Sequence, residues 1–562
     1  MFAPIVPKGK GLSRVLSTLG VRFGLRSTAP PPTVAAVLPP TPAVLPIPSG
    51  LPFGTGGQRA NLAQLSQPGA MRPAFVAESA VARKYLDLFG PLDWAHFPER
   101  PTQRAWPGPT PAPRAPYVAA YLVKLNEGLR SMGHLRTYLV EHPALAWVLG
   151  FPLRPDPTAK AGFDVERSLP SRRQLGRVLR DLDNAAAQFL LDASVQLIAQ
   201  ELPPALRFAD IVSGDTKHIV AWVKENNPKA YVSDRYDKNK QPLGDPDCKL
   251  GCKRRHNQGE GNGGANTRPE SAPTAPVAAR PVSALGGSGE VPTTTPTPAR
   301  QASVGEFYWG YGSGVIVTKV PGWGEFVLAE LTQTFDKSDV TYFFPLMQQV
   351  ERRLGHRPRF GAFDAAFDAF YVYDYFHQAG GFAAVPLVER GGYKERSFSP
   401  DGLPLCAAGH PMPLKFTFTD RTTTLVVHQR AKYVCPLCFP QASADTTVAA
   451  PDEPACSINH QNWAKGGCTA MMPTSPGARI RYQLDRDSAE FKQVFQQRTA
   501  DERVNSQAVE LGIERPRLRR GSAITNQNSL IYVLINLRAL QRVRTYTEEL
   551  ARQRSTPNQP GV

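Results

Sequence analysis

Apolar and polar residues recur at helical spacing in an early part of the chain. Residues 118–125 and 135–142 have the periodicity of two helices. The second should end at His142, because Pro143 disfavours the α conformation of the residue before it. Residues 168–180 have the pattern of a capped helix start whose basic residues lie on one side. The pattern predicts an all-helical N-terminal domain.

Further along, short β-like runs alternate with helical stretches. Residues 208–215 and 359–364 are strand-like and each ends in an aspartate, and residues 307–317 are typical of a strand pair. A helix is expected over 342–354 and a short strand over 381–388. Strands alternating with helices predict an α/β architecture with its site at strand ends.

Two insertions interrupt this pattern. Residues 258–303 are rich in Gly, Pro, Ser, Thr and Ala and should form an unstructured excursion. Residues 391–480 contain the alternating segments 414–419 and 424–428, which predict a β-rich insertion.

The two ends of the chain look different from the rest. The first seventy residues are dense in proline and lack acidic side chains, which predicts a mobile basic tail. Near the other end, Asn528-Ser529 should cap an apolar helix that packs on the sheet. The chain thus divides into 1–74 tail, 75–202 helical domain, 203–257, 304–390 and 481–546 as three parts of an α/β core, 258–303 linker, 391–480 β-rich insertion and 547–562 flexible tail.

Three acidic residues in unrelated segments carry the candidate chemistry. Asp215 and Asp364 stand at strand ends, and Glu502 lies on a helical stretch. Carboxylates that converge from distant segments can hold two divalent cations, which stabilise the attacking and leaving oxygens of a phosphodiester displacement. Each aspartate could instead be a turn or helix cap, and Asp368, one turn beyond Asp364, could be the true ligand. Cutting and joining of DNA strands is the expected chemistry.

One helix face supports this interpretation. Arg498, Glu502, Asn505 and Val509 follow each other at spacings that place them on the same face. An Arg-Glu pair four residues apart can also be a simple surface ion pair, which contributes about 0.3–0.5 kcal/mol to stability.

The sequence from Asp215 to about Arg544 resembles the catalytic region of bacterial insertion-sequence transposases of the DDE type. The similar stretches are Gly214-Asp215-Thr-Lys-His-Ile-Val and Phe363-Asp364-Ala-Ala-Phe-Asp368. The third acid lies in a stretch similar to the family's Tyr-(2)-Arg-(3)-Glu-(6)-Lys signature, with Arg498 and Glu502 in place.

Two positions depart from that signature, because Phe495 replaces the tyrosine and Val509 the lysine. Residues 144–151 resemble the family's N-terminal module.

The resemblance implies a ribonuclease H-like core and a Mg²⁺ or Mn²⁺ site. Asp215 and Asp364 would hold two ions between them, Glu502 would complete one ligand set, and Arg498 and Asn505 would orient Glu502 or touch a phosphate. The β-rich insertion is familiar in such transposases, where its position implies contact with DNA ends.

Charge agrees with a DNA partner. The 562 residues carry a net charge of +17, which suits a polyanion because neutralised phosphates release counterions. Arg172, Arg173 and Arg177 could belong to a helix-turn-helix that reads terminal repeats, or to a solvated face of a helical bundle. A second cluster should contact phosphates or lie in a solvated loop, and it contains Arg517, Arg519 and Arg520.

Cysteines gather in the β-rich insertion. Cys406, His410, Cys435 and Cys438 form two close pairs compatible with a structural zinc, with Cys456, His460 and Cys468 as alternative ligands. Free buried cysteine is the alternative, and the odd total of seven argues against a disulfide framework.

The expected protein is a transposase acting on double-stranded DNA as a homodimer or higher assembly. It lacks an apolar run long enough for a bilayer, so a bacterial cytoplasmic, nucleoid-associated location is expected. Two alternatives stay open: a ribonuclease H-like nuclease without strand transfer, and a DNA-binding protein that has lost catalysis.

Overall fold

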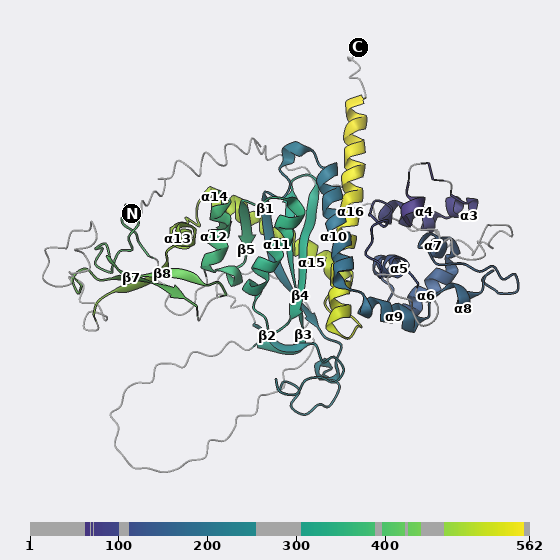
Figure 1. Ribbon diagram of the computed structural model, residues 1–562, viewed down its shortest axis with the longest axis horizontal. Helices are drawn as coiled ribbons and strands as arrows, with labels where there is room; N and C mark the ends of the chain where they lie inside the picture. Colours follow the sequence, from purple (N-terminus) through teal and green to yellow (C-terminus); the bar gives the residue numbers. More distant parts are fainter. Residues whose placement is uncertain are drawn as a thin grey trace, which may run out of the picture.

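The computed structural model describes residues 62–67, 69–70, 72–100, 112–254, 305–387, 396–421, 425–439 and 466–555. Within these ranges the protein is a mixed α/β molecule, as predicted. A central sheet lies between a small second sheet on one side and the N-terminal helices on the other, with the long helix α16 beside those helices (Figure 1). The predicted linker 258–303 lies outside the described residues, as do residues 1–61 and 556–562 of the predicted tails.

The central sheet is mixed. β1 runs antiparallel to β3 and parallel to β5, and β3 also pairs with β4 and β2. β6 adds a second parallel pairing at the β5 edge. The strands are β1 (Ile211–Val220), β2 (Lys249–Arg254), β3 (Gly305–Val320), β4 (Gly324–Thr334), β5 (Phe360–Phe363) and β6 (Phe382–Ala384).

Two sequence predictions about these strands need correction. β1 does not end at Asp215 but continues to Val220, because its second half pairs with residues 310–314 of β3. The expected strand pair at 307–317 is one long strand, β3, whose hairpin partner β4 follows after a turn.

Side chains alternate between the two faces of the sheet, which two different cores cover. On one face, Ile316 of β3 packs with α11 (Phe343–Leu354) and α12 (Phe370–Gln378). On the other face, its neighbours Val315 and Val317 pack with α15 (Thr499–Glu510) and α16 (Gly521–Ser555). This alternation follows from the two-residue period of a strand and places Asp215, the partner of Val315, on the α15 side.

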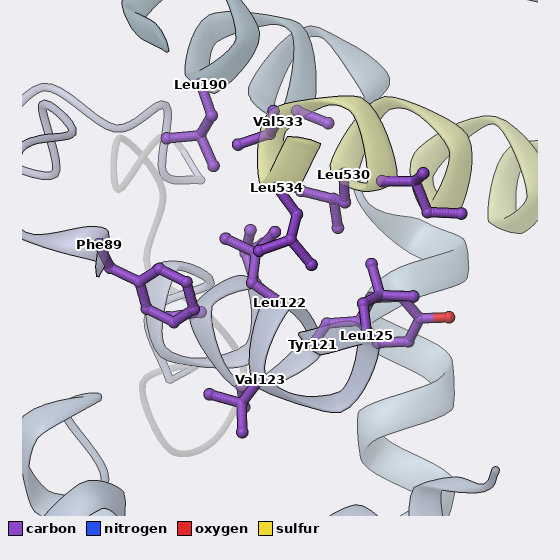
Figure 2. Close-up of a cluster of buried hydrophobic side chains, with 14 of the residues drawn as sticks. Phe89, Tyr121, Leu122, Val123, Leu125, Leu190, Leu530, Val533 and Leu534 are labelled. Carbon is purple, nitrogen blue, oxygen red and sulfur yellow. The ribbon is translucent and has the colours of Figure 1, made fainter. Parts of the chain in front are cut away.

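The N-terminal helices share the second core. Side chains of α4 (Ala80–Phe89), α5 (Ala115–Asn126) and α10 (Asn184–Glu201) meet α16 in the cluster shown in Figure 2, where Leu122 and Leu125 face Leu530 and Leu534. Tyr121 adds a buried hydrogen bond from its hydroxyl to Gln527 Oε1, at 2.8 Å.

Within the described residues, the boundaries of both predicted tails need correction. Leu62 and Leu65 of α2 (Leu62–Leu65) are buried in the shared core, although the tail was expected to reach residue 74. α16 begins at Gly521, not after a cap at Asn528-Ser529, and it continues to Ser555 through part of the predicted C-terminal tail. The Asn528 and Ser529 side chains bond β4 instead of the helix start, because they are buried against that strand.

The remaining N-terminal helices follow the sequence pattern. His142 leaves the α region and Pro143 starts the next helix, as expected. Ser171 caps the basic helix by accepting a hydrogen bond from the Gln174 N–H. These helices are α3 (Ala74–Glu78), α6 (Met132–Glu141), α7 (Pro143–Val148), α8 (Val165–Ser168) and α9 (Arg172–Asp181).

The predicted β-rich insertion contains a separate antiparallel sheet of β7 (Leu414–Asp420), β8 (His428–Val434) and β9 (Thr469–Pro473). The strand expected over 424–428 is wrong, because His428 is only the first residue of β8, where it pairs with Asp420. α13 (Pro476–Gln483) and α14 (Ala489–Phe495) lead back to the central sheet. None of the helices in the described ranges is both long and apolar enough to cross a bilayer.

Candidate active site

Asp215 and Asp364 are neighbours across two parallel strands. Gly214 of β1 is in register with Phe363 of β5, and each aspartate is the next residue along its chain. Adjacent strands lie about 4.8 Å apart, so this register places the two carboxyl groups side by side. Asp364 also caps the short helix after β5, since its Oδ1 accepts a hydrogen bond from the Ala366 N–H at 3.0 Å.

The two carboxyl groups influence each other. Burial raises the pKa of Asp215, and the Asp364 charge raises it further, while the Thr216 N–H and the Arg498 guanidinium lower it. Both Asp215 oxygens have fixed donors: Oδ1 accepts from Thr216 N at 2.8 Å and Oδ2 from Asn505 Nδ2 at 2.9 Å. The Asp215 side chain is therefore held in one orientation, with a like charge beside it.

The third predicted acid is on the expected helix but points elsewhere. Glu502 lies in the first turn of α15, its side chain is 66 % exposed, and its Oε1 is 3.2 Å from the Arg498 guanidinium. Arg498 in turn interacts with Asp215. The structure thus joins Glu502 to Asp215 through a shared arginine, while Asn505 contacts Asp215 directly.

Two further acids stand at this site that the sequence did not single out. Burial and the Asp364 charge raise the pKa of Asp339 to about 6, and Asp215 adds to the effect. Asp501 is buried, and burial followed by the Asp215 charge raises its pKa well above the usual value. Asp339 opens a 3₁₀ turn after β4 and Asp501 directly precedes Glu502, so neither has a distinctive local pattern.

Asp368, the alternative to Asp364, belongs to another part of the molecule. Its two oxygens accept hydrogen bonds from Arg481 Nε at 2.7 Å and Nη2 at 2.5 Å, and the Tyr373 hydroxyl donates a third. Its side chain is fully buried. This ion pair links α13 to the core, which accounts for Asp368 without a metal.

The donors suit a hard cation, although they are not gathered around one point. Carboxylate oxygens of Asp215 and Asp364 are the ligands that Mg²⁺ and Mn²⁺ prefer, and the buried Asn505 Oδ1 has no hydrogen-bond partner in the described part of the chain. Within the described ranges, no group of three or more His, Cys, Asp or Glu side chains is close enough to hold a metal ion. Glu502 would have to turn away from Arg498 to join the pair.

The two positions that depart from the transposase signature have different surroundings. Phe495 is stacked on Phe491, with ring centroids 5.7 Å apart, and the Arg498 guanidinium lies 5.8 Å from its ring centroid. Phe495 therefore helps position Arg498 by packing. Val509 is 37 % exposed near the end of α15 and brings no polar group.

The predicted DNA-binding arginines form two surface groups. Arg172, Arg173 and Arg177 are exposed on α9. Arg173 and Arg177 line a pocket of about 320 Å³ together with Arg100 and Arg114 from neighbouring segments. Four arginines thus line one pocket in the helical part.

The second group is exposed but not beside the acids. Arg517, Arg519 and Arg520 follow α15, and Arg519 lies over the exposed Trp222 ring at 5.1 Å. The Val220 N–H bonds the Glu514 carbonyl, so this segment adjoins the end of β1. Val220 lies five positions along the strand from Asp215, roughly 17 Å. Arg519 is therefore at the far end of β1, which does not support the prediction that the cluster adjoins the metal site.

All four predicted zinc ligands lie in loops beside the small sheet, and a further cysteine, Cys468, lies with them. Cys435 is buried, Cys406 and Cys438 are half-buried, and the Cys435 N–H donates to the Cys468 carbonyl at 2.9 Å. His410 contributes its backbone to the Cys406 turn. The alternatives Cys456 and His460 lie outside the described residues.

No family model matches this chain, and no curated protein gives a significant sequence match.

Proposed function

We propose that this protein is a DDE-type DNA transposase, which cuts DNA at the ends of a mobile element and joins them to target DNA. The observation that carries the proposal is the side-by-side placement of Asp215 and Asp364 across β1 and β5. Two interacting carboxyl groups on neighbouring parallel strands, with an arginine beside them, form a candidate phosphodiester site.

The fold offers support of a second kind. The strand order β4-β3-β1-β5-β6 has antiparallel pairing on one side of β1 and parallel pairing on the other. This order, with one acid on β1 and one after β5, supports a ribonuclease H-like core. The net charge of +17 supports a polyanionic partner.

Each residue at the site has a role in this proposal. Asp215 and Asp364 would hold divalent cations, which when bound stabilise charge on the attacking and leaving oxygens of the phosphodiester. Asn505 and the Thr216 N–H fix the Asp215 carboxylate. The Arg498 guanidinium can release the Glu502 carboxylate and bind a DNA phosphate in its place. This would free Glu502 to turn toward the aspartates.

One observation favours a second candidate, a DNA-binding protein that has lost catalysis. Glu502 is largely exposed and bonded to Arg498, and Val509 supplies no cation at the lysine position. Such a protein would bind the same DNA without changing it. A nuclease on the same fold would cut the DNA without joining it.

A strand-transfer assay distinguishes the three. The full chain is incubated with Mg²⁺, target plasmid and 3′-labelled DNA from the ends of the sequence that flanks its gene. A transposase yields labelled joined product, and Asp215→Asn removes both cutting and joining. Asp487→Asn is the matched control, because that acid is 99 % exposed and is not one of the site residues. Cutting without joining identifies a nuclease, and binding without cutting identifies the inactive protein; either result contradicts the proposal.

A further inference from the structure

Four cysteines come together at one end of the small sheet. Cys435 directly follows β8 and Cys468 directly precedes β9, at the point where Val434 pairs with Thr469. The Cys435 N–H donates to the Cys468 carbonyl at 2.9 Å, and the Phe439 N–H closes the Cys435-Pro-Leu-Cys438 turn onto the Cys435 carbonyl at 3.0 Å. Three of the four cysteines therefore share one hairpin end.

Gly467 holds the segment before Cys468 tightly against this turn. Its φ is +77°, which favours glycine, and a Cβ at this position would lie 2.7 Å from both Cys435 Cβ and Cys438 Sγ. The same Cβ would be 3.2 Å from Cys435 Sγ. The sulfur atoms of Cys435 and Cys438 thus lie on the same side of their turn, facing the chain that leads to Cys468.

Cys406 reaches the group from a second tight turn. The bridge between Leu405 and Pro411 closes this turn, and the Cys406 N–H donates to the His410 carbonyl at 2.9 Å. Burial raises the pKa of the Cys406 thiol, whereas hydrogen bonds from the His410 and Ala408 N–H groups lower it. Cys406 also interacts electrostatically with Cys468 and Cys435. Cys406 therefore lies near the hairpin end that holds the other cysteines.

The small sheet also needs support beyond its own core. Among the described residues its buried cluster is small: it comprises Met412, Ala431, Tyr433, Ala470 and Met472, with partly buried neighbours that include Cys406 and Cys468. A core of this size rarely stabilises a β unit alone, and small units of this kind are commonly held by disulfides or a structural metal. None of the four cysteines forms a disulfide within the described part of the chain.

We propose that Cys406, Cys435, Cys438 and Cys468 bind one structural Zn²⁺, so that Cys468 replaces the predicted His410 as the fourth ligand. Four sulfur ligands favour Zn²⁺ over the Mg²⁺ proposed for the acids. Binding releases the thiol protons to solvent and draws the turns inward, since the described side chains are not yet close enough to hold an ion. This inference is independent of the proposed function.

Metal content of the full chain tests the ligand set. Protein purified in reductant without chelator should contain about one zinc per chain when its metal content is measured by inductively coupled plasma mass spectrometry. Cys468→Ser and Cys435→Ser should lose it. His410→Ala and Cys252→Ser should retain it, because neither residue is among the four proposed ligands and Cys252 is an exposed cysteine on β2. Retention by Cys468→Ser together with loss in His410→Ala would overturn the assignment.

A second measurement needs no variant and so does not depend on variant folding. Zinc-depleted, reduced wild-type chain is titrated with Co²⁺ while its visible and near-ultraviolet absorption is recorded. One equivalent should produce tetrahedral ligand-field bands and intense sulfur-to-cobalt charge transfer, which added Zn²⁺ abolishes. Absence of sulfur charge transfer, or a disulfide among these cysteines in freshly purified protein, would refute the site.

Discussion

Asp339 is the residue at which the candidate site can be probed without DNA. It faces Asp364, Asp215 and the Thr216 side chain, and burial together with the Asp364 charge raises its pKa to about 6. An acid whose pKa is higher in the folded protein than in the unfolded chain stabilises the fold while it is protonated. That contribution is complete below about pH 4 and is lost as the pH rises through about 6.

We therefore predict that, in chelator, part of the wild-type thermal stability is lost between about pH 4 and about pH 6, and that Asp339→Asn reduces this loss. Mg²⁺ should restore stability above about pH 6, where the carboxyl groups are ionised and can bind it. Melting temperatures across this pH range, with and without Mg²⁺, provide the measurement. A pH dependence identical in wild type and Asp339→Asn would exclude Asp339 from the acidic cluster. Asp215 and Asp501 have raised pKa values too, so a partial reduction is expected.

Sequence reasoning succeeded at this scale where a residue follows directly from its local element. Asp364 comes right after β5, as predicted, and Asn505 lies on α15, whereas Arg498 lies in the 3₁₀ turn just before that helix. Asp339 and Asp501 were missed because their importance comes from neighbours distant in sequence. Asp368 was left open for the same reason: its partner Arg481 lies 113 residues further along the chain.

At the scale of elements, α16 connects the two halves of the molecule. Asn536 in its middle is fully buried, donates to the Val327 carbonyl at 2.8 Å and to Ser194 Oγ at 3.0 Å, and accepts from the Val327 N–H at 2.8 Å. Val327 stands at a register shift between β3 and β4, where Val317 pairs with Val327 and Ile316 with Ala329. Asn536 thus satisfies the backbone groups that this bulge leaves without ladder partners.

Asn536→Ala should lower the free energy of unfolding by about 3 kcal/mol, because it leaves a buried N–H and a buried carbonyl of Val327 unpaired. Chemical denaturation of the full chain, followed by circular dichroism, measures the change. Gln541→Ala on the exposed side of the same helix is the matched control and should change stability by less than about 0.5 kcal/mol. An equal effect of the two substitutions would contradict this role for Asn536.

Periodicity placed several helices near their observed positions, including α11, α15 and the break at His142, but it did not identify α4, α10 or α12. It misplaced the start of α16, since a run of polar residues such as Asn526, Asn528 and Ser529 has the local pattern of a helix cap. Their side chains instead bond to distant partners, among them the Leu179 carbonyl and Glu330. Register and long-range bonding of this kind have no local signature, which is also why β1 was ended too early at Asp215.

At the scale of the whole molecule, the arginines of α9 lie in the helical part, across α16 from the sheet that holds the acids (Figure 1). Arg173 and Arg177 share their pocket with Arg100 and Arg114, so they form a candidate phosphate contact surface apart from the active site. Their replacement should weaken DNA binding while leaving the acidic cluster intact.

Replacing both Arg173 and Arg177 with alanine should reduce the slope of log affinity against log salt by about 2, roughly one per lost phosphate contact. Fluorescence anisotropy with duplex DNA at several salt concentrations gives this slope. Arg83→Ala on α4 is the control, because Arg83 is also exposed but lies away from the pocket. An unchanged slope in the double variant would show that α9 is a solvated face.

The claim on which the account depends is that Asp215 and Asp364 hold the cations that activate DNA phosphodiesters, and metal rescue of Asp364→Cys tests it most directly. Nicking of supercoiled plasmid is measured for wild type and variant in Mg²⁺ and in Mn²⁺. In Mg²⁺ the variant should lose about 1,000-fold in rate, equivalent to about 4 kcal/mol of transition-state stabilisation. In Mn²⁺, which accepts a softer sulfur ligand, it should recover a substantial part of that rate. Equal nicking by variant and wild type in Mg²⁺, or a loss that Mn²⁺ does not relieve, would contradict the account.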